Sequence, residues 1–260
     1  MKTTIKSVLV LGIAALCSTS VYAERLISDP GATLPAFCFQ LSRDVGSNSL
    51  HLGDGIQVKD VDTNDAYRLF CTDLYTHVSD DYSNGAGQVY NPVALSDSMF
   101  HTDVQKVQLQ SLFDHVYTKA FNADYSVKDS AYANIFQLAV WEIANDTASN
   151  LSLRDGDVAI AKAYVITGQS SSGGLYGYWD SGVYNTVLNT LDSWFDAIIN
   201  DSWSDIGYAE DHVNLTVYMA EGGTSASQTF IGVAVAPEPA TMLILGLGIA
   251  GLGLARKRRK

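Results

Sequence analysis

The chain has 260 residues, of which 47% are hydrophobic, and it carries 28 Asp and Glu against 16 Lys and Arg, a formal net charge of −12. A surface with this acidic excess repels nucleic acid, so we exclude a nucleic-acid-binding function. Length and apolar content suffice for one sizeable buried core, and we expect a single α+β domain between two processing signals.

Residues 1–23 have the layout of a secretory signal peptide. Lys2 and Lys6 supply a positive start, residues 8–16 are apolar, and residues 21–23 form a small-x-small cleavage site. We therefore predict cleavage after Ala23 and an exported domain over residues 24–236.

The first half of that domain is predicted to consist of short strands at residues 36–41, 49–58 and 67–71, because apolar and β-branched residues there are bounded by Gly, Asp and Asn turns. The acidic stretch from Asp60 to Asp65 is predicted to be a turn. It cannot be an EF-hand loop, since the sixth position is Asp65 and the twelfth, where a bidentate acid is required, is Cys71.

A helical part follows a Gly-, Ser- and Asn-rich loop at residues 80–90. Thr102 and Gln105 form a capping box, and Val104, Val107 and later apolar residues continue at helical spacing to residue 120. Further helices are predicted at residues 129–145, 158–166 and, after a loop at 170–177, 184–199, the last with a wide apolar stripe.

The domain ends in a predicted β-hairpin, with strands at residues 212–219 and 230–235 and a turn at 221–225. Strands at both ends with helices between them suggest that the last strands pair with the first. The expected fold is therefore α+β, an antiparallel β-sheet or sandwich of N- and C-terminal strands with an inserted helical part.

One residue of the second helix needs an explanation. Gln137 lies within the apolar face formed by Ala133, Phe136, Val140 and Trp141. An unpaired buried amide costs roughly 1–3 kcal/mol, so the amide must have partners or be consumed chemically. The ordinary explanation is a glutamine hydrogen-bonded to backbone groups.

Cys71 offers a chemical alternative. A cysteine thiol can displace ammonia from a glutamine amide and leave an internal thioester, an acyl group on a good leaving group. Leu69-Phe70-Cys71, followed later by the run from Phe136 and Gln137 to Trp141, resembles the paired motifs of thioester domains in bacterial surface adhesins. The resemblance implies a Cys71–Gln137 thioester in a domain that mixes strands and helices, with Phe70, Phe136 and Trp141 as pocket walls.

Three alternatives remain open. Cys17 is removed with the signal peptide, so Cys38 and Cys71 are the mature cysteines, and a Cys38–Cys71 disulfide would exclude the thioester. Cys71 could instead act as a hydrolase nucleophile with His77 or His115 as base. A noncovalent matrix- or glycan-binding protein would need neither Cys71 nor Gln137, and the 14 Tyr and 4 Trp permit it.

We expect single-use covalent chemistry rather than enzymatic turnover. No cofactor or metal motif is recognised: no histidines stand in a metal-ligand pair, and there is no G-x-S-x-G or phosphate loop. The expected partner of the thioester is a surface or matrix nucleophile, either a protein amine or a polysaccharide hydroxyl.

The last 24 residues carry a second signal. Pro237-Glu238-Pro239 precedes an apolar run at residues 242–255 and a basic cluster at 256–260. The apolar run predicts a membrane-spanning helix whose basic end stays in the cytoplasm. This tripartite tail at residues 237–260 is similar to the PEP-CTERM sorting signal of Gram-negative bacteria that produce exopolysaccharide. It implies export through the inner membrane, transient anchoring, cleavage by an exosortase, and release to the cell surface or extracellular matrix.

Overall fold

The structure is a computed structural model of the whole chain. It describes residues 24–28, 37–42, 51–52, 55–62, 64–73, 88–98, 101–146, 151–156, 158–169, 175–221 and 228–233. The predicted signal peptide at residues 1–23 and the apolar run at 242–255 lie outside these residues. In the part of the chain that is described, no helix is long and apolar enough to cross a membrane.

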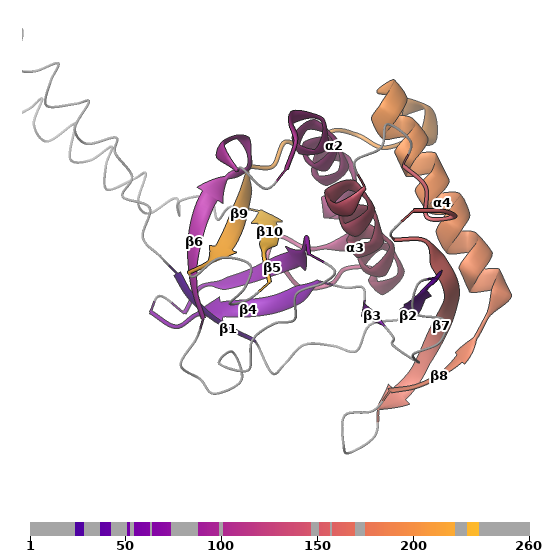
Figure 1. Cartoon of the computed structure of the whole chain (residues 1–260), viewed down its shortest axis with the longest axis horizontal. Helices are drawn as coiled ribbons and strands as arrows, with labels where there is room; N and C mark the ends of the chain where they lie inside the picture. The colour runs from indigo at the N-terminus through magenta and orange to yellow at the C-terminus, as the bar shows by residue number, and fades with distance from the viewer. Residues whose placement is uncertain are drawn as a thin grey trace, which may run out of the picture.

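Six antiparallel strands close into a barrel, seen at the left of Figure 1. In order around the barrel they are β1 (Glu24–Ser28), β4 (Ile56–Asp60), β5 (Ala66–Cys71), β10 (Phe230–Val233), β9 (Leu215–Ala220) and β6 (Gln88–Ala94). The expected pairing of the chain's two ends is confirmed, because β10 lies antiparallel to β5, with Phe230 opposite Cys71. Closure leaves this sheet no free edge, so the sheet is a barrel and not one layer of a sandwich.

Four further strands form a separate antiparallel sheet at the right of Figure 1. Their order is β3 (His51–Leu52), β2 (Phe37–Leu41), β7 (Ile160–Gln169) and β8 (Leu175–Trp179). The helix predicted at residues 158–166 is therefore wrong: this segment forms the start of β7, hydrogen-bonded between β2 and β8. Its apolar residues are nearly continuous, and such a run has no period that separates a buried strand from a helix.

Two other strand predictions need correction. The single strand expected at residues 49–58 is two strands, β3 and β4, which belong to different sheets. Residues 88–90 and 175–177, predicted as parts of loops, belong to β6 and β8. In contrast, the acidic turn is confirmed as the β4–β5 connection, where the Asp60 N–H donates to the Asp65 carbonyl.

Within the described residues, three long helices pack between and beside the sheets: α2 (Asp103–Ala120), α3 (Ser130–Asn145) and α4 (Ser181–Asn200). The same residues include two short 3₁₀ helices, η3 (Leu95–Asp97) after β6 and η4 (Trp203–Ile206) after α4. All three long helices are confirmed within a few residues of the prediction, as is the capping box at Thr102. The predicted apolar face of α2 is partly wrong. Val104 and Val107 are 62% and 69% exposed, whereas Leu109, Leu112 and Val116 are buried.

Helix α3 is the element that joins the two sheets. It contacts β5 of the barrel and β2 of the second sheet, and it packs against α2 and α4 (Figure 1). Residues 133–143 of this helix are all buried, including Asn134 and Gln137. The Asn134 Oδ1 accepts from the Phe37 N–H of β2 at 2.6 Å, whereas Gln137 bonds to β5. Two buried side-chain amides of α3 are therefore hydrogen-bonded to different sheets, Asn134 to the second sheet and Gln137 to the barrel.

Candidate functional site

Gln137 and Cys71 are direct partners. The Cys71 backbone N–H donates to the Gln137 Oε1 at 3.2 Å, and the Gln137 Nε2 donates to the Cys71 carbonyl at 2.9 Å. Both residues are buried, with 1% and 8% of their surface exposed. The polar atoms of the carboxamide are therefore satisfied by backbone, as in the ordinary explanation, and the backbone is that of the cysteine singled out by the sequence.

The Gln137 carboxamide makes the hydrogen bonds that a residue of a neighbouring strand would make with Cys71. The β4–β5 ladder runs from Lys59 opposite Ala66 to Ile56 opposite Leu69, and so stops short of Cys71. Paired residues in an antiparallel ladder exchange two N–H to O bonds, and the Gln137 amide makes the same two bonds with Cys71. Because residues 133–143 of α3 are all buried, packing fixes this part of the helix and orients the amide beside the cysteine.

The thiol has a different partner, Gln228, which sequence reasoning missed. The Cys71 Sγ donates to the Gln228 Oε1 at 3.1 Å, while the Gln228 Nε2 donates to the Asp73 carbonyl at 2.7 Å. Gln228 lies two residues before β10, and the adjacent Thr229 carbonyl accepts from the Thr72 N–H, so the strand pairing brings it to the end of β5. No local pattern marks Gln228, because the contact spans 157 residues.

Burial controls the protonation of the thiol. Desolvation raises the pKa of Cys71 to about 12; a hydrogen bond with backbone lowers it slightly, and the charge of Asp73 raises it. Cys71 is therefore a neutral thiol at neutral pH. Ordinary cysteine hydrolases use a thiolate activated by a nearby cation, and among the described residues no cation contributes to the pKa shift of Cys71.

Two of the three expected pocket walls, Phe70 and Phe136, pack against each other on the face of β5 opposite the Cys71 thiol. Phe70 and Phe136 are fully buried and meet edge to face, with ring centroids 4.9 Å apart, in a cluster with aromatic residues of α2. Successive strand side chains point to opposite faces, so the Phe70 ring and the Cys71 thiol leave β5 on opposite sides. Trp141 is buried one helical turn after Gln137, and its carbonyl accepts from the Asn145 Nδ2, which also bonds to the Thr72 carbonyl.

The structure places Cys38 and Cys71 in different sheets. Cys38 lies buried in β2 of the second sheet, Cys71 ends β5 of the barrel, and both thiols are free. Burial raises the pKa of Cys38 as well. The expected alternative of a Cys38–Cys71 disulfide is thus not formed in this arrangement.

His115, one of the two histidines considered as a base, contacts other residues and not Cys71. The His115 ring stacks on Trp203, with centroids 4.8 Å apart, and its Nδ1 lies 2.8 Å from the Ser111 carbonyl. His77 lies outside the described residues. Within the described part of the chain, the hydrogen bonds of Cys71 go to Gln137 and Gln228 and to no histidine.

Comparison with known proteins identifies one part of the chain. Residues 235–259 match the family model described as the PEP-CTERM protein-sorting motif. The searches of curated proteins and of solved structures give no match. The sorting motif supports the predicted tail signal and implies export, membrane-associated sorting and processing by an exosortase-type enzyme.

Proposed function

We propose that this is a surface or matrix protein of a Gram-negative bacterium in which Cys71 and Gln137 form an internal thioester. The thioester would attach the protein covalently to an amine or hydroxyl of a partner. The sorting motif at residues 235–259 supports the exported location. The observation that carries the thioester proposal is the buried, reciprocal pair of hydrogen bonds between the Gln137 carboxamide and the Cys71 backbone.

The chemistry balances without a cofactor. The Cys71 S–H bond breaks as Sγ bonds to the Gln137 Cδ, the Cδ–Nε2 bond breaks, and the thiol proton leaves with Nε2 as ammonia. A partner amine or hydroxyl later bonds to Cδ while the Sγ–Cδ bond breaks, and the nucleophile's proton goes to Sγ to restore the thiol. The result is a one-time acyl transfer that uses the logic of covalent catalysis without turnover.

The hydrogen bonds favour the addition step. As Sγ adds to the amide, negative charge develops on the Gln137 Oε1, the atom that already accepts from the Cys71 N–H. A preorganised backbone donor at a developing oxyanion stabilises the transition state, and it does so more strongly in a site that excludes water. The same burial protects the product, since water must reach Cδ to hydrolyse it.

Intact mass of the exported protein tests the proposal. Freshly purified wild-type protein should weigh one ammonia less than its processed sequence, and Cys71→Ala and Gln137→Ala should each abolish this deficit. Cys38→Ala is the matched control, a buried cysteine of the other sheet, and should keep it. Methylamine should add to Gln137 of the wild type and release one thiol at Cys71.

Two results would contradict the proposal. One is a wild-type mass equal to the unmodified sequence in protein never exposed to amines. The other is a non-reducing peptide map that links Cys38 to Cys71, which would also show a rearrangement of the two sheets.

A noncovalent matrix-binding function is the second candidate, favoured by one observation. Tyr178 and Trp179 of β8, the edge strand of the second sheet, are 55% and 51% exposed. Exposed aromatic rings offer flat apolar faces to a ligand while their polar atoms stay in water. Trp179→Ala should then weaken retention on matrix polysaccharide, whereas Cys71→Ala should leave it unchanged; the thioester proposal expects the reverse.

A further inference from the structure

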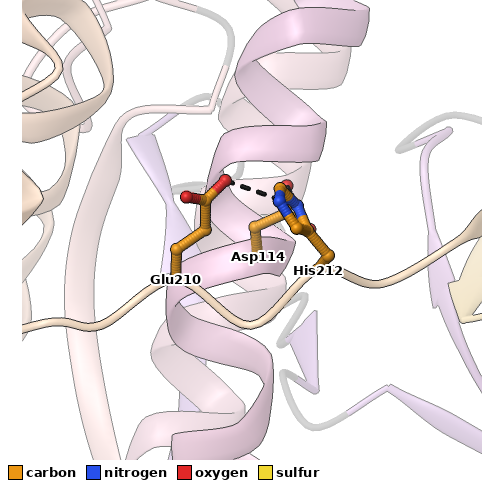
Figure 2. Close-up of side chains that lie close together, drawn as sticks. All are labelled: Asp114, Glu210 and His212. Atoms are coloured by element: carbon orange, nitrogen blue, oxygen red, sulfur yellow. Dashed lines mark ion pairs between the residues drawn. The ribbon is translucent and has the colours of Figure 1, made fainter.

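A second cluster of reactive side chains lies away from Cys71, on α2. Asp114 projects from the helix toward the segment that leads into β9, and Glu210 and His212 of that segment project beside it (Figure 2). The His212 Nδ1 is 3.3 Å from the Glu210 Oε1 and 3.7 Å from the Asp114 Oδ2. All three ligand atoms lie within 4.8 Å of one another.

Asp114 is oriented in a way that leaves one oxygen for the cluster. It is 94% buried, and its Oδ1 accepts from the Gln110 Nε2 at 2.8 Å and from the Val213 N–H at 2.9 Å. Its Oδ2 accepts no hydrogen bond from the described residues and faces the His212 ring. A carboxylate oxygen that accepts no hydrogen bond and faces an imidazole nitrogen is placed to act as a ligand of a cation.

The segment that carries the other two residues is held in place over α2. The Asp211 N–H donates to the Asp114 carbonyl at 2.6 Å, the Gln110 Nε2 donates to the Val213 carbonyl at 2.8 Å, and the Thr118 Oγ1 donates to the Asp211 Oδ2 at 2.7 Å. These bonds fix Asp211 and Val213 against the helix, and they hold the neighbouring Glu210 and His212 beside Asp114 (Figure 2).

We propose that Asp114, Glu210 and His212 bind one divalent transition-metal ion of the zinc type. Carboxylate oxygen and imidazole nitrogen are common zinc ligands, and three protein ligands leave a fourth position for water. Ligands at about 2.0–2.1 Å from a tetrahedral ion are about 3.4 Å apart, close to both separations from the His212 Nδ1. The exposed Glu210 side chain can rotate to complete the geometry.

Charge supports a dication at this position. Two carboxylates and a neutral imidazole carry two negative charges, which a divalent ion offsets in full. The exported domain, residues 24–236, contains 27 Asp and Glu against 9 Lys and Arg, so the molecule as a whole attracts cations. A plain ion pair would account for the cluster less well, because His212 is 83% exposed and exposed pairs contribute only about 0–1 kcal/mol.

Equilibrium dialysis of the metal-free exported protein against zinc at pH 7 tests the site. We expect one saturable zinc ion per chain, with at least tenfold weaker binding in His212→Ala and in Glu210→Gln. Both variants alter exposed side chains, so they should fold. Asp114 is not substituted, because its Oδ1 also accepts hydrogen bonds from Gln110 and Val213. Zinc should raise the unfolding temperature of the wild type and not of His212→Ala.

Control variants distinguish zinc binding at this cluster from zinc binding by other side chains. His115→Gln changes the next residue of α2 without touching the cluster, and Glu221→Gln removes an exposed acid elsewhere; both should bind as the wild type does. Cys71→Ala should also keep the zinc, so the result is independent of the thioester proposal. Absence of saturable binding, or equal binding by wild type, His212→Ala and Glu210→Gln, would overturn the inference.

Discussion

At the scale of single residues, two glutamines from distant parts of the chain contact different groups of Cys71. Gln137 bonds to its backbone and Gln228 to its thiol. In our proposal Gln137 is the acyl donor, and Gln228 is a positioning residue that directs the S–H. Because each glutamine carries a carboxamide, their roles can be separated by substitution.

Replacing Gln228 should slow thioester formation without changing its location. Gln228→Ala removes the acceptor of the thiol and the donor to the Asp73 carbonyl, so we expect a lower fraction of ammonia-deficient protein shortly after refolding. Mass spectrometry at successive times measures the rate. A deficit that persists in Gln137→Ala and vanishes in Gln228→Ala would assign the acyl group to Gln228 instead.

The raised pKa of Cys71 predicts the reactivity of the free thiol. In a Cys38→Ala, Gln137→Ala protein, where Cys71 cannot form the thioester, alkylation at pH 8 should be roughly 1000-fold slower than in the urea-unfolded chain. The reason is that a pKa of about 12 instead of 9.0 lowers the thiolate fraction. The rate should rise about tenfold per pH unit while the protein stays folded. Fast, pH-independent alkylation would show that the thiol is not desolvated.

At the scale of elements, Gln105 links the start of α2 to the end of α3. Its Oε1 accepts from Thr102 in the capping box, and its Nε2 donates to the carbonyls of Ile143, Ala144 and Asp146. One buried side chain therefore caps both helix ends. By local rules a glutamate at this position would serve equally well, since Glu and Gln are interchangeable in a capping box.

The tertiary contact predicts the opposite result. Gln105→Glu keeps the capping acceptor but places a carboxylate against three carbonyl oxygens, so we expect a loss of about 2–3 kcal/mol in the free energy of unfolding. Thr102→Ala removes only the cap and should cost about 1 kcal/mol. Urea unfolding of the two variants checks the order. An equal or smaller loss for Gln105→Glu would mean that the contact with α3 contributes little.

At the scale of the whole molecule, the sorting motif at residues 235–259 follows the domain in which we propose the thioester. The barrel draws strands from both ends, so the domain is complete only when residues 230–233 pair with β5. The sorting motif begins at residue 235, directly after that strand. Processing at the motif therefore leaves β10 and the Gln228 contact intact.

Substitution of the motif should block processing. In a cell with the matching exosortase, wild-type protein should lack the basic residues 256–260, whereas a variant with Pro237, Glu238 and Pro239 changed to Ala should retain them in the membrane fraction. Glu221→Gln, an acid outside the motif, is the matched control. Mass spectrometry of surface-extracted protein makes the comparison. Recovery of wild-type protein with its basic tail would favour a permanent anchor.

What the sequence determined by itself consists of features encoded within a few residues. The capping box at Thr102, the bounds of α3 and α4 and the terminal hairpin follow from local spacing, because caps and periodicity act over one or two turns. The sorting motif was identified by its resemblance to a known signal, which the family match supports. Gln137 was also identifiable, since a polar residue in an apolar helix face stands out in the periodic pattern.

Only the tertiary structure decided which distant segments meet. Residues 158–166 read as a helix, yet β2 and β8 make them a strand by pairing on both sides. Val104 and Val107 have helical spacing but face solvent, because α2 packs through another face. Cys38 and Cys71 share a strand-like pattern but belong to different sheets. No local sequence pattern predicts the contact of Gln228 with Cys71 or the cluster around Asp114. Strand pairing and side-chain clusters join residues far apart in the chain, so their partners depend on the packing of the whole domain.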